Sequence, residues 1–376
     1  MSTWPDRRIL DLFGIDVPIV LAPMAGPGTP ELAAAVSDAG GLGSLPCAQL
    51  SIEQMRASLS VLGPSASRPL NLNFFCHSPP AADAARNLLW RDRLRPYYIE
   101  LGIDPEAASP LAGRQPFDGD FCRLVESYGP RVVSFHFGLP RNDLLQRVKA
   151  TGAKVISSAT TVAEARWLES RGCDAIIAMG LEAGGHRGNF LTDDMARQVG
   201  TFALVPQVVD AVTVPVIAAG GIADARGIVA AFALGASAVQ IGTAYLFCPE
   251  ANISPVHRTA LTSAGDDDTM VTNVFTGRPA RGVINRIMRE QGPLSCVAPA
   301  FPRAADALAP LKAKSEAAGQ SDFSNLWSGQ AARLARRSLP AGQLTGFLAQ
   351  QALERLLRQG LGPPDKPRHP TPSPHT

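Results

Sequence analysis

Short apolar runs recur along the chain, and each is closed by glycine, proline or a polar residue. The runs are apolar at every position, which is typical of parallel strands buried on both faces, whereas a half-exposed strand alternates. They predict eight strands, at residues 19–24, 41–46, 69–75, 132–137, 154–159, 174–179, 214–219 and 238–243.

Segments that favour helix lie between most of these strands, at residues 30–39, 51–62, 141–150, 161–171, 203–212 and 224–234. Eight strands that alternate with helices predict an α/β protein with a (β/α)8 TIM barrel. An open doubly wound sheet is the alternative that the same pattern allows.

The strand–helix repeat also suggests how the chain is divided. Residues 1–264 are expected to form the barrel, with insertions at 76–131, which adds helices, and at 184–202, which lengthens a loop. Residues 265–350 are expected to form a smaller C-terminal cap that borders the substrate. The proline-rich end, residues 360–376, cannot bury apolar area and is expected to be disordered.

Composition narrows the class of protein without assigning a function. The 376 residues are 45% hydrophobic and 18% charged with a formal charge of +2, which fits a soluble globular protein with a sizeable core and argues against nucleic-acid or membrane partners. The six cysteines show no CxxC or Cys/His spacing, so we expect no metal site and no disulfide framework. With no signal peptide evident at the N-terminus, this predicts a cytoplasmic protein.

Glycines follow the seventh and eighth predicted strands, at Gly220, Gly221 and Gly242, with Thr243 next in the chain. Backbone N–H groups at such turns bind phosphate, and barrels often hold a phosphate at the loops after these two strands. Glycines can also simply end strands, so the pattern indicates a phosphate site without establishing one.

The first strand ends in LAPMAG, where Ala22, Pro23 and Met24 would cross the barrel mouth with little side-chain bulk. Asn73 on the third strand could offer an amide to a ring edge. A flat apolar shelf, an amide and a phosphate anchor together would suit flavin mononucleotide (FMN). Ordinary core packing is the alternative, particularly for Met24.

The stretch GLEAGGHRG follows the sixth strand and places His186 behind two glycines. Glycine lets the backbone approach another group closely, and histidine exchanges a proton near neutral pH. His136, at the end of the fourth strand, could face the same cavity or be a core residue. Arg187 could attract an anionic substrate or pair with a carboxylate. His77 and His257 are expected to be structural.

Long motifs, chiefly GLEAGGHRGNF, ALVPQVVDAVTVPVIAAGGIADARG, ASAVQIGTAYL and FTGRPARGVINRIMRE, resemble those of class I nitronate monooxygenases, formerly called 2-nitropropane dioxygenases. The resemblance runs through most of residues 15–345. It implies an FMN-dependent enzyme that oxidises alkyl nitronates such as propionate-3-nitronate, a toxic metabolite, with O2 to a carbonyl compound and nitrite.

The resemblance also implies roles for individual residues. His186 matches the family's catalytic base, which takes the α-proton of a neutral nitroalkane, and His136 matches a second active-site histidine. Lys312 is a candidate pocket lysine. The implied FMN contacts are Asn73, Gly184, Gly220, Gly221, Gln240, Ile241, Gly242 and Thr243, with Ala22, Pro23 and Met24 beneath the ring.

One position departs from the family pattern: Met179 stands where the family usually has glutamine, so a hydrogen bond to the flavin would be lost. Two alternatives stay open, of which Met179 favours only the second. The first is an NAD(P)H-dependent flavin reductase of the enoyl-acyl-carrier-protein reductase or quinone reductase type. The second is a flavin-binding scaffold without chemistry. The expected oligomeric state is a monomer or a homodimer.

Overall fold

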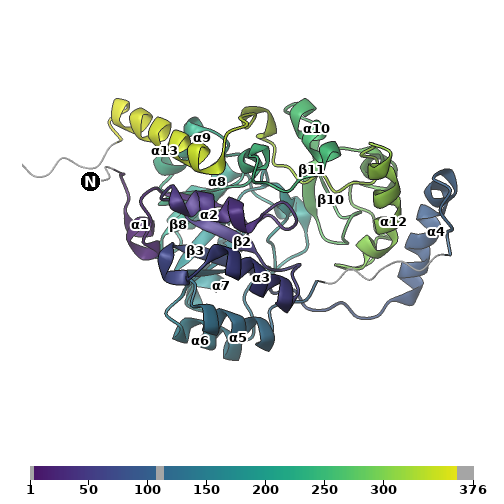
Figure 1. Ribbon diagram of the computed structural model, residues 1–376, viewed down its shortest axis with the longest axis horizontal. Helices are drawn as coiled ribbons and strands as arrows, with labels where there is room; N and C mark the ends of the chain where they lie inside the picture. Colours follow the sequence, from purple (N-terminus) through teal and green to yellow (C-terminus); the bar gives the residue numbers. More distant parts are fainter. Residues whose placement is uncertain (1–3, 107–113, 362–376) are drawn as a thin grey trace, which may run out of the picture.

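The computed structural model describes residues 4–106 and 114–361, and its centre is a barrel of eight parallel strands (Figure 1). Their order around the barrel is β1-β9-β8-β6-β5-β4-β3-β2. Leu42, just before β2, closes the ring: its N–H donates to the Ile19 carbonyl, and its carbonyl accepts from Leu21 N–H, each at 2.9 Å. The barrel is thus confirmed against the open sheet. The strands are β1 (Ile19–Leu21), β2 (Gly43–Pro46), β3 (Leu70–Phe75), β4 (Val132–His136), β5 (Lys154–Ala159), β6 (Ala175–Met179), β8 (Val216–Ala219) and β9 (Ala238–Ile241).

Helices cover the outside of the barrel, and most begin at a residue whose side chain caps the first turn. Thr29 accepts from Leu32 N–H, and Ser51 forms a capping box with Gln54. Asp224 caps α9 in the same way, by accepting from Arg226 N–H. These helices are α2 (Pro30–Asp38), α3 (Ile52–Leu62), α5 (Gly119–Tyr128), α6 (Asn142–Ala150), α7 (Val162–Ser170), α8 (Thr201–Val209) and α9 (Ala225–Ala233).

The last described helix, α13 (Ala341–Arg358), returns to the barrel and packs between α2 and α9 (Figure 1). Its Thr345 hydroxyl lies 2.7 Å from the Tyr245 hydroxyl, deep in the core. Although the sequence groups residues 341–350 with the cap, the apolar face of this helix completes the outer layer of the barrel. The predicted disordered tail, residues 360–376, lies outside the described residues from 362 onward.

A second, smaller unit stands beside the barrel mouth. An antiparallel sheet joins β7 (Gly185–His186) to β11 (Ala280–Val283) and β10 (Thr269–Thr272). Around it lie α10 (Pro255–Ser263), α11 (Arg286–Gln291) and α12 (Ala304–Ala317). The insertion helix α4 (Ala84–Glu100) packs on α12, far from α1 (Arg8–Phe13) (Figure 1).

The interior of the barrel contains polar side chains that hydrogen-bond to one another. Asn71 donates to the Ser44 hydroxyl and Asn73 to the Ser134 hydroxyl, each at 2.9 Å. Both asparagines are buried. These bonds satisfy an amide donor of each asparagine, which would otherwise cost free energy inside the barrel, and they fix the orientation of Asn73, while Oδ1 of Asn71 stays without a partner. None of the helices in the described ranges has the length and apolar character to cross a membrane.

Candidate active site

A cavity that is partly open to solvent lies at the carboxyl ends of the barrel strands. Active sites of parallel barrels are found at this face because the loops after the strands converge there. Residues predicted for the site on different strands line this one cavity. Its lining includes Ala22, Pro23, Met24, Asn73, His136, Met179, Gly184, His186, Gly220, Gly221, Gln240, Gly242 and Thr243.

One end of the cavity is built from backbone. Gly220 and Gly221 have φ of 110° and 71°, a region that favours glycine. In the described part of the chain, the N–H groups of Gly221 and Gly242 donate to no protein acceptor. These unpaired donors at the ends of adjacent strands can bind an anion such as phosphate.

Beside this corner, two glycines allow neighbouring loops to pack closely against each other. A Cβ on Gly184 would lie 2.6 Å from Gly329 N, and a Cβ on Gly329 would lie 2.9 Å from the Glu182 carbonyl oxygen. Gly329 N–H donates to the Thr243 hydroxyl at 2.9 Å, which ties this loop to the end of β9. Gly184 and Thr243 are predicted from the sequence, whereas the loop at 328–329 is found only in the structure.

Gln240 points from β9 into the cavity, and its Oε1 is buried without a hydrogen-bond partner. An unpaired buried acceptor costs free energy, so this oxygen indicates a ligand that brings a donor. Ile241, the next residue, was also predicted as a cofactor contact. Its side chain is instead fully buried in the core, because successive strand residues face opposite sides. Its carbonyl accepts from Ala22 N–H.

His186 is held at the cavity edge by the small sheet, where it pairs with Ala280 of β11. Its ring lies among aromatic rings, 5.4 Å from both Phe301 and Trp327 between centroids. Burial, reinforced by the positive charge of Arg114, holds the pKa of His186 well below its usual 6.5. The imidazole is therefore neutral at physiological pH, as a proton acceptor must be.

The ring of His186 is oriented by a threonine that the sequence analysis did not identify. Nε2 of His186 lies 2.9 Å from the Thr276 hydroxyl, and that hydroxyl can donate in turn to the Arg278 carbonyl at 3.4 Å. Thr276 is thus able to accept from a protonated Nε2. In that tautomer, Nδ1, which has no hydrogen-bond partner among the described residues, carries the free lone pair.

His136 lies beside His186 and lines the same cavity. Its Nε2 is 3.2 Å from the His186 carbonyl oxygen, so Nε2 carries the proton and donates. Nδ1, at 3.0 Å, then accepts from the Ser158 hydroxyl. Burial lowers the pKa of His136 to about 3, which keeps this tautomer neutral.

Arg187 has neither of the roles that the sequence suggested, because it contacts neither the cavity nor a carboxylate. It is fully buried and donates to the Met179 carbonyl at 2.9 Å and to the Gly180 carbonyl at 2.8 Å. A third bond reaches Gln198. Arg187 therefore anchors the loop that carries His186 to the end of β6.

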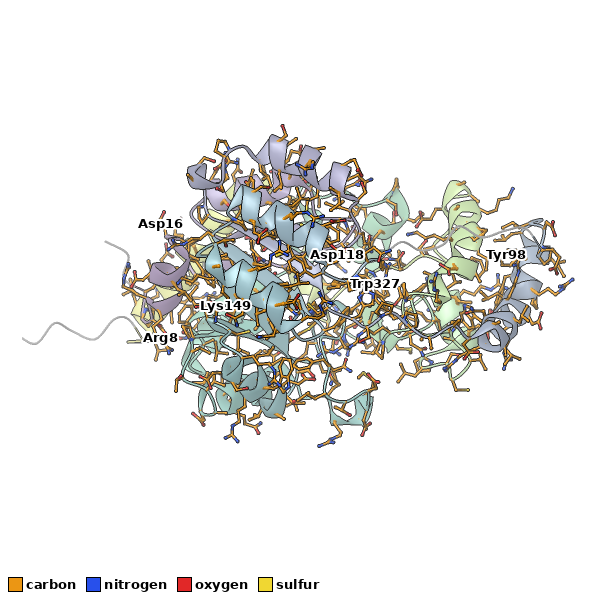
Figure 2. All side chains as sticks on the ribbon, turned by 90° about the horizontal axis from the view of Figure 1, so that it is seen from below. Arg8, Asp16, Tyr98, Asp118, Lys149 and Trp327 are labelled. Atoms are coloured by element: carbon orange, nitrogen blue, oxygen red, sulfur yellow. The ribbon has the colours of Figure 1, made fainter. Side chains whose placement is uncertain are left out.

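Lys312 does not line the main cavity. It lies in a neighbouring cavity with His257, and its Nζ donates to the Asn325 amide oxygen at 2.7 Å. Trp327 lines both cavities and separates them. Figure 2 shows Trp327 between the barrel, marked by Asp118 and Lys149, and the outer helices, marked by Tyr98. Lys312 lies on the side of Trp327 away from the main cavity, because α12 carries it there.

The arrangement defines a barrel enzyme in which unpaired backbone donors and a neutral histidine line one cavity. A family model described as nitronate monooxygenase matches residues 6–351. The nitronate monooxygenase of Pseudomonas aeruginosa is 41% identical over 350 residues, which cover 92% of this chain and 98% of that one. The chain therefore belongs to the nitronate monooxygenase family, a group of flavin-dependent oxidoreductases.

Solved structures agree with this assignment. Nitroalkane oxidase from Streptomyces ansochromogenes is similar with a TM-score of 0.84 and 36% identity, over 94% of this chain and 99% of that one. FabK from Thermotoga maritima is similar with a TM-score of 0.71 and 30% identity, over 96% and 99% of the two chains. The nitroalkane oxidase is thus the stronger of these two matches.

Proposed function

We propose that the protein is an FMN-dependent nitronate monooxygenase that oxidises alkyl nitronates, such as propionate-3-nitronate, with O2 to a carbonyl compound and nitrite. The observation that carries the proposal is the position of His186. A neutral imidazole, surrounded by aromatic rings, lines the same cavity as the unpaired backbone donors of Gly221 and Gly242. Membership of the nitronate monooxygenase family supports the same function.

The residues of the cavity fit FMN. The N–H groups of Gly221 and Gly242 would hold its phosphate, and the backbone of Ala22–Met24 would lie beneath the ring. The unpaired Oε1 of Gln240 would accept from a ring N–H. Asn73 and Gly184 complete the set that we assign to the cofactor. When bound, FMN supplies the electron acceptor and the site of reaction with O2.

The protein residues supply proton chemistry and shielding. His186 would remove the α-proton of a neutral nitroalkane through Nδ1, while Thr276 holds Nε2. An ionised nitronate needs no such step. Phe75 and Trp327 line the cavity and exclude water from the space beside the base.

Three further assignments are part of this proposal. We place the enzyme in the cytoplasm because its six cysteines are unpaired in the structure. Removal of toxic nitronates is the cellular role that would follow from the proposed substrate. A monomer or a homodimer is the oligomeric state we expect.

An anaerobic experiment tests the proposal against its alternatives. One sample of purified protein receives excess NADH and a second receives propionate-3-nitronate, while the visible spectrum is followed. A yellow protein that ignores NADH and is bleached by the nitronate supports the proposal. Rapid reduction by NADH alone would favour the reductase, and a yellow protein that responds to neither would favour a binding scaffold.

A further inference from the structure

The guanidinium of Arg114 lies near His186, on a segment that the family motifs do not include. Arg114 lies with its Cζ 5.4 Å from the centre of the Phe301 ring, and His186 lies 5.4 Å from the same ring. Gln49, which lines the cavity, accepts from Arg114 Nη2 at 3.1 Å and Nε at 3.3 Å in the amide orientation that satisfies both groups. The guanidinium is therefore tethered to the cavity wall.

The guanidinium of Arg114 has an unused donor. Its Nη1 is buried and has no hydrogen-bond partner, and no ion pair involves Arg114 within residues 4–106 and 114–361. The seven residues before it, 107–113, read AASPLAG and contain no acid. Arg187, by contrast, is buried with each of its guanidinium nitrogens bonded to an oxygen.

A buried cation without a counter-ion is costly, so it is commonly paired or used to bind an anion. Burial lowers the pKa of Arg114 to about 10, which leaves it charged at neutral pH. Its charge is also the strongest of those that lower the pKa of His186. The charge of Arg114 therefore acts on His186 through a region where water screens it weakly.

We propose that Arg114 is a specificity-determining residue that binds a carboxylate carried by the nitronate substrate, at the end away from the reacting carbon. The reacting carbon must lie against His186, and the ring of Phe301 is near both groups: its centre is 5.4 Å from the His186 ring centre and 5.4 Å from Cζ of Arg114. A second anionic group, separated from the nitronate by a short apolar spacer, suits this arrangement. The inference rests on the proposed function.

The test compares propionate-3-nitronate, which has a carboxylate, with ethyl nitronate, which has none. Arg114→Gln should raise KM for propionate-3-nitronate roughly 10- to 100-fold, the range expected for a charge-assisted hydrogen bond. It should leave KM for ethyl nitronate and both kcat values within about threefold. Arg114→Lys keeps the charge and should recover part of the loss.

Two other variants make the test decisive. Gln49→Glu would pair the guanidinium internally without removing it, and it should raise KM for propionate-3-nitronate selectively, even if Arg114→Gln does not fold. Arg147→Gln removes an exposed arginine paired with Glu126 and serves as the matched control. Equal effects on both substrates, or none on either, would overturn the role of Arg114. If the unmodified enzyme oxidises neither nitronate, the proposed function itself fails.

Discussion

The backbone carbonyl of His186 accepts a hydrogen bond from Nε2 of His136 at 3.2 Å. The two histidines therefore have different tasks, although both line the cavity. His136 is committed to Ser158 and to the backbone, so it positions the residue beside it. The ring of His186 is left with one nitrogen free for a substrate.

Replacement of His186 by asparagine should separate the two forms of the substrate. Because general-base catalysis contributes about 10²- to 10⁴-fold, kcat/KM for a neutral nitroalkane should fall by that amount. The preformed nitronate, which has already lost its proton, should be affected much less. Steady-state oxygen consumption measures both, and equal losses would remove the general-base assignment.

Thr276→Val should weaken the base without removing it. The substitution deletes the hydroxyl 2.9 Å from Nε2 of His186, so the ring loses its preferred tautomer and orientation. We expect a roughly tenfold loss with neutral nitroalkane and little change with nitronate. Thr276→Ser retains the hydroxyl and is the control. Similar activity in the valine and serine variants would argue that Thr276 has no part in orienting the base.

Gln240→Leu should lower the affinity for FMN by up to about tenfold, because the variant lacks the acceptor that we assign to a ring N–H. The protein without cofactor should be no less stable, since an unpaired buried oxygen has been removed. Fluorescence titration gives the affinity, and thermal unfolding of the cofactor-free protein gives the stability. An unchanged affinity would show that Gln240 does not contact the flavin.

Met179→Gln tests the departure from the family pattern. Met179 is buried at the cavity wall, at the end of β6. A glutamine there would supply an amide where the family has one, so FMN binding should become tighter or stay the same. Weaker binding, measured in the same titration, would show that Met179 does not cost this chain a hydrogen bond to FMN.

Four histidines, two of them buried and two partly buried, should make stability depend on pH. Burial lowers the pKa of His77 and His257 to about 4 and that of His136 to about 3, and it holds His186 below 6.5. The unfolded chain takes up these protons at higher pH, so the free energy of unfolding should be greatest above pH 6.5 and fall toward pH 4. Each group contributes about 1.4 kcal/mol per pH unit at most.

Urea unfolding between pH 7 and pH 4 measures this dependence. His257→Gln, on α10 and outside the main cavity, removes one titrating group and should make the decline less steep. A free energy of unfolding that does not change over this range would mean that the histidines are accessible to protons in the folded state.

Sequence alone determined the barrel and where its chemistry would lie. Apolar runs at every strand position require burial on both faces, and their alternation with helices leaves few architectures. The glycines at 220, 221 and 242 follow strands closely and His186 lies in the loop after β6, so the parallel direction of the strands brings them to one face. This is why the predicted Gly221, Gly242 and His186 line a single cavity.

Other features depended on contacts between distant segments, which local patterns do not encode. Thr276 meets His186 across 90 residues, because β7 pairs with β11. Arg114 reaches Gln49 from an insertion, and α13 joins the barrel wall. Lys312 is a candidate pocket lysine by resemblance, but the packing of α12 places it in the neighbouring cavity. The order of residues fixed the local structure, while tertiary packing decided which side chains meet.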